Sequence, residues 1–293
     1  MVLSVSELPK IFSGIPRSGT TSIHLNHWRQ QVIDNPDNFP GFVDESYRIL
    51  PIYSYKKSDV PVFTTSPDDK NISVGMSYQG FAQITEPSIE YYKMVKERIE
   101  FMKQYPHSVV SQKFFGFDYW IVNRVDPDWM QDIIHNNHFV YVLRKDVYKS
   151  IASYMYAAAI DNFHFFEQPN NVSKVFYNTF SLRDLMRKNI LALVHLMKTT
   201  PHFSIMYLED YKKKDNFEQY NQSVRTIKRK DLLPPGKWSQ TPVIVKKDYE
   251  KIGSNYNQFL QKARIYLSEI VDESDGILQL EDDELTVNVK KLG

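Results

Sequence analysis

The chain has no cysteine among its 293 residues, which excludes disulfides, thiolate catalysis and cysteine-based zinc sites. It also has no apolar run near the ~20 residues that a membrane-spanning helix needs. Neither charge is in surplus, since 36 Lys and Arg stand against 35 Asp and Glu, and this balance argues against nucleic acid as the main partner. The eight histidines have no obvious carboxylate companions, so we expect no metal site.

The organisation of the chain shows no internal repeat and no low-complexity tract. Its first ten residues lack both the basic segment and the apolar core of a signal peptide. The length suits one large α/β domain with a sizeable core, or two small domains. We expect a single domain over residues 1–293. Within it we expect a polar, turn-rich insertion at 54–88 and an acidic, solvated C-terminal tail from about residue 272.

Residues 14–21 read GIPRSGTT and lie between an apolar segment at 10–13 and a stretch of helical periodicity from Ile23. A loop in that position directs backbone N–H groups and the positive end of a helix dipole at one spot, which suits a phosphate or sulfate. The spacing is nearly that of a Walker A loop, but Thr20 replaces the lysine that kinases need. Arg17 instead brings a planar cation into the loop. An ordinary strand-to-helix turn is the alternative.

The hexapeptide PRSGTT at 16–21 resembles the 5′-phosphosulfate loop of sulfotransferases that use 3′-phosphoadenosine 5′-phosphosulfate (PAPS). It is most similar to the loop of the carbohydrate and tyrosylprotein enzymes. The resemblance implies an α/β fold of the P-loop NTPase-like type, with three layers and a central parallel β-sheet flanked by helices. It implies PAPS as cosubstrate and 3′-phosphoadenosine 5′-phosphate (PAP) as product. The residues that it implies in binding the 5′ end are Arg17, Ser18, Gly19, Thr20 and Thr21.

A second motif follows the clearest strand pattern of the chain, residues 138–143. Arg144 comes directly after this strand and precedes a helical pattern that carries Ser150 and Ser153. This order is similar to the 3′-phosphate motif of the same family, which implies that Arg144 pairs with the 3′-phosphate and that a helix serine adds a hydroxyl. Ser153 is our first choice, and Ser150, one turn earlier on the same face, is the alternative.

A third motif consists of Arg229 and Lys230, followed by GKW at 236–238. It looks like a loosened form of the basic cosubstrate loop of the family, which implies that the two cations lie over the 3′-phosphate. A basic surface loop is the other interpretation. Separately, a core strand pattern at 108–113 ends on Lys113, at the edge where α/β sheets bind ligands. The family carries a lysine here, which implies a catalytic role for Lys113.

An acidic pair, Asp44 and Glu45, follows the turn-rich break at 35–41. By position it resembles the catalytic glutamate of the family, which implies that Glu45 is the general base; Asp44 is the alternative and His24 the next candidate. Sulfuryl transfer has a loose transition state, so positioning and charge do most of the work. Arg17 and Lys113 would stabilise that charge while Glu45 takes the proton of the acceptor hydroxyl, with no metal needed.

The three motifs occur in the order of the family between residues 10 and 272, which predicts a PAPS-dependent sulfotransferase. Aromatic residues form 14% of the chain and suit stacking on sugars, so we expect a carbohydrate hydroxyl as acceptor. A tyrosine acceptor, in a protein or a small phenol, is one alternative; a P-loop nucleotide-binding protein or kinase is another. We expect no nucleic-acid partner, no membrane span and a cytoplasmic location, unless an N-terminal anchor like that of Golgi relatives has been removed.

Three further helices are expected, from about residue 88 to Pro106, from Ser181 onwards, and over 255–272. Ser181 and Asp184 resemble a capping box at the start of the second of these. A buried strand is expected at 203–208. The residues after it, Glu209-Asp210-Tyr211, are similar to a structural strand end found late in the family.

Overall fold

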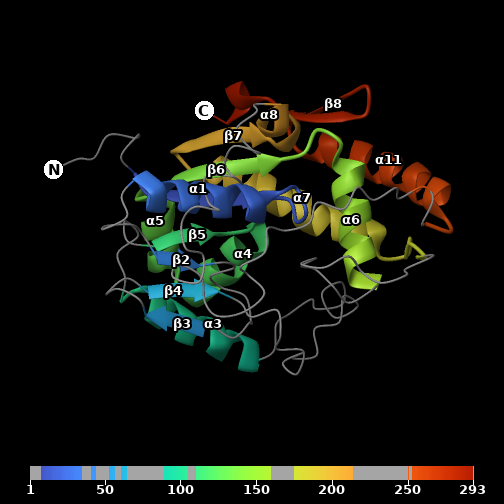
Figure 1. Ribbon diagram of the computed structural model, residues 1–293. Coiled ribbons are helices and arrows are strands. Elements are labelled where there is room, and N and C mark those ends of the chain that lie inside the picture. Colours follow the sequence, from blue (N-terminus) through green and yellow to red (C-terminus); the bar gives the residue numbers. More distant parts are fainter. Residues whose placement is uncertain are drawn as a thin grey trace.

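A seven-stranded β-sheet organises the computed structural model of this protein (Figure 1). The structure describes residues 8–34, 41–43, 53–56, 61–64, 89–104, 110–159, 175–213, 250 and 253–292. The strands are β1 (Lys10–Gly14), β2 (Gly41–Val43), β3 (Tyr53–Lys56), β4 (Pro61–Thr64), β5 (Val110–Lys113), β6 (His138–Leu143) and β7 (Phe203–Tyr207). Their order is β3-β4-β2-β5-β1-β6-β7, and every neighbouring pair is parallel except β3 with β4.

Helices and a terminal hairpin accompany the sheet. The described helices are α1 (Thr20–Asp34), α3 (Ile89–Met102), α4 (Gly116–Val125), α5 (Pro127–His135), α6 (Val147–Ala159), α7 (Leu182–Thr199), α8 (Leu208–Lys213) and α11 (Tyr256–Glu273). The hairpin pairs β8 (Leu278–Glu281) with β9 (Glu284–Val287) in antiparallel register, and a 3₁₀ turn, η5 (Val289–Lys291), follows.

The alternation of side chains along the central strands divides the apolar residues between two faces of the sheet. Ile11, Phe139 and Tyr141 belong to the larger core, which helices α3 to α7 and α11 complete. Phe12 and Val140, their neighbours in sequence, belong to a smaller core that also contains residues of α1 and α8. Figure 1 accordingly shows α1 in front of β6 and α7 behind it. The prediction of an α/β fold with a parallel sheet flanked by helices is confirmed, and the arrangement is compatible with three layers.

Periodicity located the longer elements well. In α3 the spaced residues Val95, Ile99 and Met102 are all buried, as a helix after residue 88 predicts. The apolar stripe expected after Ser181 is the buried face of α7, and the last expected helix is α11. These elements follow a strong local pattern, which tertiary contacts then reinforce.

Two local predictions were wrong. Ser181 occupies the N-cap position of α7, but its side chain makes no capping hydrogen bond, so the capping box with Asp184 does not form. The strand at 203–208 was expected to be buried, whereas β7 is only half-buried and Ser204 is exposed. The reason is topological, because β7 is the edge strand beyond β6.

Parts of the expected insertion belong to the sheet. β3 and β4 fall within or at the border of residues 54–88, and β4 pairs in parallel with β2 through Phe63 and Val43. The other residues of this segment up to 88 lie outside the described ranges. The described strands therefore extend the sheet at the side remote from β7.

The acidic segment after residue 272 contains more structure than its composition suggests. Its four consecutive acids at 281–284 are exposed, as expected, at the tip of the β8–β9 hairpin. The apolar residues on either side, Ile277, Leu278 and Leu285, are 1–3% exposed and belong to the larger core. The segment is thus a packed hairpin with a solvated tip.

Helices α4 and α7 are in close contact at Gly116, the first residue of α4. A Cβ at this position would lie 2.6 Å from the backbone carbonyl carbon of Ala192 and 2.7 Å from the backbone nitrogen of Leu193. Backbone atoms in a packed helix cannot move aside singly, so any side chain here must separate the two helices.

We expect Gly116→Ala to lower the free energy of unfolding by about 1–3 kcal/mol, the usual cost of overpacking a core. Ser181→Ala is the control, since its hydroxyl is buried without a hydrogen-bond partner among the described residues. It should change stability by less than ~0.5 kcal/mol, where a true N-cap serine would lose ~1 kcal/mol. Urea denaturation of the three proteins measures both; equal stability of Gly116→Ala and wild type would contradict the close contact.

Candidate functional site

The order of the strands predicts a ligand crevice between β1 and β6. From β1 the chain passes to β2 on one side of the sheet, and from β6 it passes to β7 on the other. β1 and β6 are themselves neighbours, with Gly14 opposite Val142. In open parallel sheets such a reversal leaves a crevice outside the carboxyl ends of the two strands, and ligands bind there. The residues after Gly14 and after Leu143 meet at this point.

The backbone of the loop at 15–19 turns sharply between β1 and α1. Arg17 has a left-handed φ of 70° and Gly19 one of 90°, conformations that a glycine adopts freely and an arginine rarely. A Cβ on Gly19 would lie 2.6 Å from Leu208 Cδ1, and one on Gly14 would lie 2.1 Å from the carbonyl oxygen of Val142. Gly14 is therefore required by a backbone contact and Gly19 by its left-handed φ, and the strained conformation at Arg17 marks a candidate functional residue.

Ser18 fastens the loop to β6. Its hydroxyl donates a hydrogen bond of 2.7 Å to the carbonyl oxygen of Val142 and lies 3.1 Å from Thr20 Oγ1. Its backbone N–H donates to the carbonyl oxygen of Ile15 at 3.1 Å. Ser18 is fully buried, and Thr20 is 3% exposed. Both polar groups of Ser18 are thus engaged inside the protein, so this residue shapes the predicted phosphate loop from within.

Arg17 connects the loop with the second predicted motif. Its Nε donates a hydrogen bond of 3.2 Å to Ser153 Oγ on α6, although 136 positions separate the two residues. Ser153 is 6% exposed, and Ser150, one turn earlier, is fully buried. The structure therefore brings together two residues that the sequence assigned to opposite ends of one ligand. Ser150 Oγ has no hydrogen-bond partner among the described residues.

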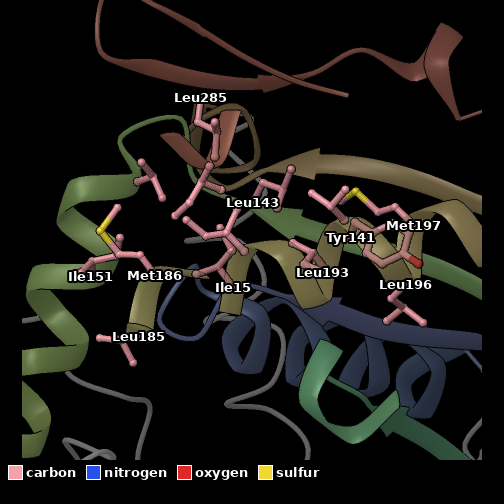
Figure 2. Packing of buried hydrophobic residues seen from close by; sticks show 14 of the residues in the cluster. Ile15, Tyr141, Leu143, Ile151, Leu185, Met186, Leu193, Leu196, Met197 and Leu285 are labelled. Atoms are coloured by element: carbon pink, nitrogen blue, oxygen red, sulfur yellow. The ribbon is translucent and has the colours of Figure 1, made fainter. Parts of the chain in front are cut away.

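The apolar residue Ile15 attaches the loop at 15–19 to the hydrophobic core. Ile15 is 3% exposed, and Figure 2 shows it among Ile151 of α6, Met186 of α7 and Leu143 of β6. A small hollow beside it is lined by Ile15, Pro16, Ile151, Tyr154, Leu185, Met186, Asn189 and Ile190. Ile15 thus fixes the loop to apolar residues of β6, α6 and α7.

Arg144 lies at the carboxyl end of β6, beside the acids that follow β7. Its Nε is 3.5 Å from Glu209 Oε1, and Glu209 Oε2 accepts a hydrogen bond of 3.1 Å from the backbone N–H of Lys145. The next acid, Asp210, lies 3.4 Å from Lys145 Nζ. Sequence reasoning took Glu209 as part of a structural strand end and missed its contact with Arg144. A signal was present in the sequence as complementary charges: two bases follow β6, and two acids come shortly after β7.

Lys113 ends β5, next to β1, in register with Phe12. Its side chain is fully buried, and its Nζ lies 5.4 Å from the centre of the Phe115 ring. Lysine is almost never fully buried unless its charge is compensated. Lys113 is therefore a buried side chain at the carboxyl edge of the sheet and not an ordinary solvated strand end.

The histidines of α1 belong to the packing behind the loop. His24 is fully buried and its ring stacks on Phe12 at 5.1 Å between centroids. His27 lies 5.2 Å from the same ring, and burial, with a smaller contribution from Lys10, lowers the pKa of His27 to about 4. His24 was considered as a base facing the crevice. Its place in the packing around Phe12 does not favour that role.

Several predicted site residues lie outside the described part of the structure. These are Asp44, Glu45, Arg229 and Lys230, as well as the side chain of Thr21. Within the described ranges no group of three or more His, Asp or Glu side chains is arranged to hold a metal ion. In the same ranges no helix has the length and apolar character needed to cross a bilayer.

Comparison with known proteins identifies no relative. No family model, no curated protein and no solved structure matches the chain. The resemblance of its motifs to those of sulfotransferases therefore stays a prediction from the sequence.

Two buried serines give a test of the site geometry. Ser18→Ala removes the hydrogen bond to Val142 and should lower the free energy of unfolding by ~1 kcal/mol. Ser150→Ala removes a hydroxyl without a partner among the described residues, so it should be neutral or stabilising. Thermal and urea denaturation without ligand provide both values. A stability loss in Ser150→Ala as large as in Ser18→Ala would contradict these contacts.

Proposed function

We propose that this protein is a PAPS-dependent sulfotransferase with a P-loop NTPase-like fold. The observation that carries the proposal is the hydrogen bond from Arg17 Nε to Ser153 Oγ. The sequence assigned Arg17 to a 5′-phosphosulfate loop and Ser153 to a 3′-phosphate motif, and a single small nucleotide can reach both only if they are adjacent. The position of both at the crevice between β1 and β6 adds support.

The charges at the crevice suit a ligand with several anionic groups. Arg17 lies in the loop after β1, Lys113 at the end of β5 and Arg144 at the end of β6. These three strands are consecutive neighbours in the sheet, so the cations lie along one edge. The first turn of α1 carries no acid, which leaves the positive end of its dipole uncompensated there. Fixed cations at one edge favour phosphate and sulfate groups.

In the proposed reaction PAPS supplies the sulfuryl group. Side chains of the protein position PAPS and stabilise the charge that develops during the transfer. Glu45 takes the proton from the acceptor hydroxyl as its oxygen forms the new bond to sulfur. The bond from sulfur to the 5′-phosphate oxygen breaks, and Arg17 and Lys113 stabilise the negative charge that develops on that oxygen. Because these cations are already in place, they need not move when the charge develops, and they stabilise the loose transition state of the transfer.

In this scheme Ser18 does not bind the 5′ end of PAPS, although its motif implies that it does. Because its hydroxyl and its N–H are engaged with Val142 and Ile15, its contribution is the shape of the loop. Anion contacts then fall to Arg17 and to the residues that open α1. A carbohydrate hydroxyl remains the proposed acceptor; tyrosine in a protein or in a small phenol is the alternative, with a nucleotide kinase as the rival class.

Arg144→Ala should weaken PAP binding by roughly tenfold to a hundredfold, because a charge-assisted hydrogen bond contributes ~1.5–3 kcal/mol. Isothermal titration calorimetry of wild type and variant with PAP and with ATP measures this. Lys149→Ala is the control, since Lys149 is an exposed residue of α6 paired with Asp146. Tighter binding of ATP than of PAP by the wild type would reject the sulfotransferase proposal in favour of a kinase.

Glu45→Gln should abolish most sulfuryl transfer and leave PAP affinity nearly intact. General-base catalysis contributes ~10²–10⁴ in rate, and the amide keeps the shape of the side chain but cannot take a proton. Transfer from labelled PAPS to a panel of glycans, peptides and phenols supplies the rates and identifies the acceptor class.

Asp44→Asn decides between the two adjacent acids. If it alone loses activity, Asp44 is the base. If the variant that combines Asp44→Asn with Glu45→Gln keeps full activity, neither acid takes part, and the general-base step of the proposal is wrong.

A further inference from the structure

Glu209 contacts two consecutive residues of the loop that follows β6. Its Oε2 accepts a hydrogen bond from the backbone N–H of Lys145, and its Oε1 lies 3.5 Å from Arg144 Nε. Glu209 is in the first turn of α8, directly after β7, and 64 positions separate it from Lys145. One carboxylate therefore binds the backbone of this loop and forms an ion pair with the side chain of its arginine.

The loop is also held from the opposite side by the C-terminal hairpin. The backbone N–H of Leu285 in β9 donates a hydrogen bond of 2.9 Å to the carbonyl oxygen of Lys145. The N–H of Val287 donates to the hydroxyl of Tyr207 at 3.1 Å, and Lys145 Nζ lies 5.6 Å from the centre of the Tyr207 ring. With the N–H of Lys145 bound to Glu209 and its C=O bound to Leu285, this peptide segment has little freedom.

The side chain of Arg144 is held much more loosely than the backbone beside it. Its Nε is buried but makes no hydrogen bond of good geometry, and Glu209 is its one ion-pair partner among the described residues. The side chain as a whole is 20% exposed. Since the Nε is shielded from solvent, the exposed surface belongs to other atoms of the side chain. Glu209 thus determines where the remainder of the guanidinium can point.

We infer that Glu209 is the positioning residue of the site at Arg144 and sets its selectivity for a nucleotide that carries a 3′-phosphate. The inference rests on the proposed function. Two effects of the carboxylate oppose each other, because it repels an incoming phosphate while it orients the cation that binds it. Glu209 is 32% exposed, so solvent screens the repulsion. The carboxylate holds the backbone of the loop through the Lys145 N–H and attracts the Arg144 side chain from 3.5 Å, so we expect positioning to decide the net effect.

The sign of one affinity change therefore tests the inference. Glu209→Ala removes a negative charge near an anion site, so repulsion alone would predict tighter PAP binding. Positioning predicts the opposite, a loss of roughly tenfold, equal to about one charge-assisted hydrogen bond. Binding of adenosine 5′-phosphate, which lacks the 3′-phosphate, should change by less than about twofold. Calorimetry with both nucleotides, together with the melting temperature of each variant, provides the comparison.

Two further variants separate positioning from general structural damage. Glu209→Gln keeps an oxygen that can accept from the Lys145 N–H, so it should recover a large part of the lost PAP affinity. Asp210→Ala is the matched control, since this neighbouring acid contacts the Nζ of Lys145 rather than the loop backbone or Arg144. It should leave PAP affinity unchanged or slightly increase it.

The other possible results of these binding measurements show whether the positioning role of Glu209 or the proposed function is wrong. Tighter or unchanged PAP binding in Glu209→Ala, or an equal loss for both nucleotides, overturns the positioning role while the proposed function stands. Absence of PAP binding in the wild type overturns the proposed function, and the inference with it.

Discussion

The close approach of β1 and β6 at Gly14 is the constraint on which the candidate site depends. Only a residue without a Cβ allows the carbonyl oxygen of Val142 to come this near, and that carbonyl then accepts the hydroxyl of Ser18. The bond pulls the loop onto β6, the strand that leads to Arg144 and α6. A wider separation of the two strands would break the Ser18 bond and move Arg17 away from Ser153. Strand pairing and loop conformation are therefore one arrangement.

The electrostatic design of the site combines two kinds of cation. Lys113 is fully buried, so solvent screens its electrostatic interactions little. Arg144 and Lys145, by contrast, face Glu209 and Asp210 across the ends of β6 and β7, and this part of the edge is nearly balanced in charge. Affinity for an anion then depends on how the cations are oriented as well as on how many there are.

Much of the fold follows from sequence patterns, whereas most contacts of the site do not. The buried strand β6 and the apolar stripes of α3 and α7 were predicted because each is a repeated local signal over many residues. The loop at 14–21 was recognised for a different reason, the spacing of its two glycines between a strand pattern and a helix pattern.

Contacts between distant residues left no such signal. The bond of Arg17 to Ser153 and the pairing of Glu209 with Arg144 depend on how strands order themselves in the sheet. Ser181 shows the converse, since a local capping pattern was present and the bond did not form. The roles of Glu45, Arg229 and Lys230 remain predictions, as these residues lie outside the described ranges.

The hydrogen bond between Leu285 and Lys145 has a consequence for the order of events during synthesis. The ribosome produces the loop after β6 long before it produces β9, whereas a domain generally folds as a unit. The carbonyl group of Lys145 can therefore form its hydrogen bond to Leu285 only after the hairpin has been synthesised. A nascent chain stalled before β9 would lack the Leu285 N–H that binds this carbonyl, so the loop that carries Arg144 would be held from one side only.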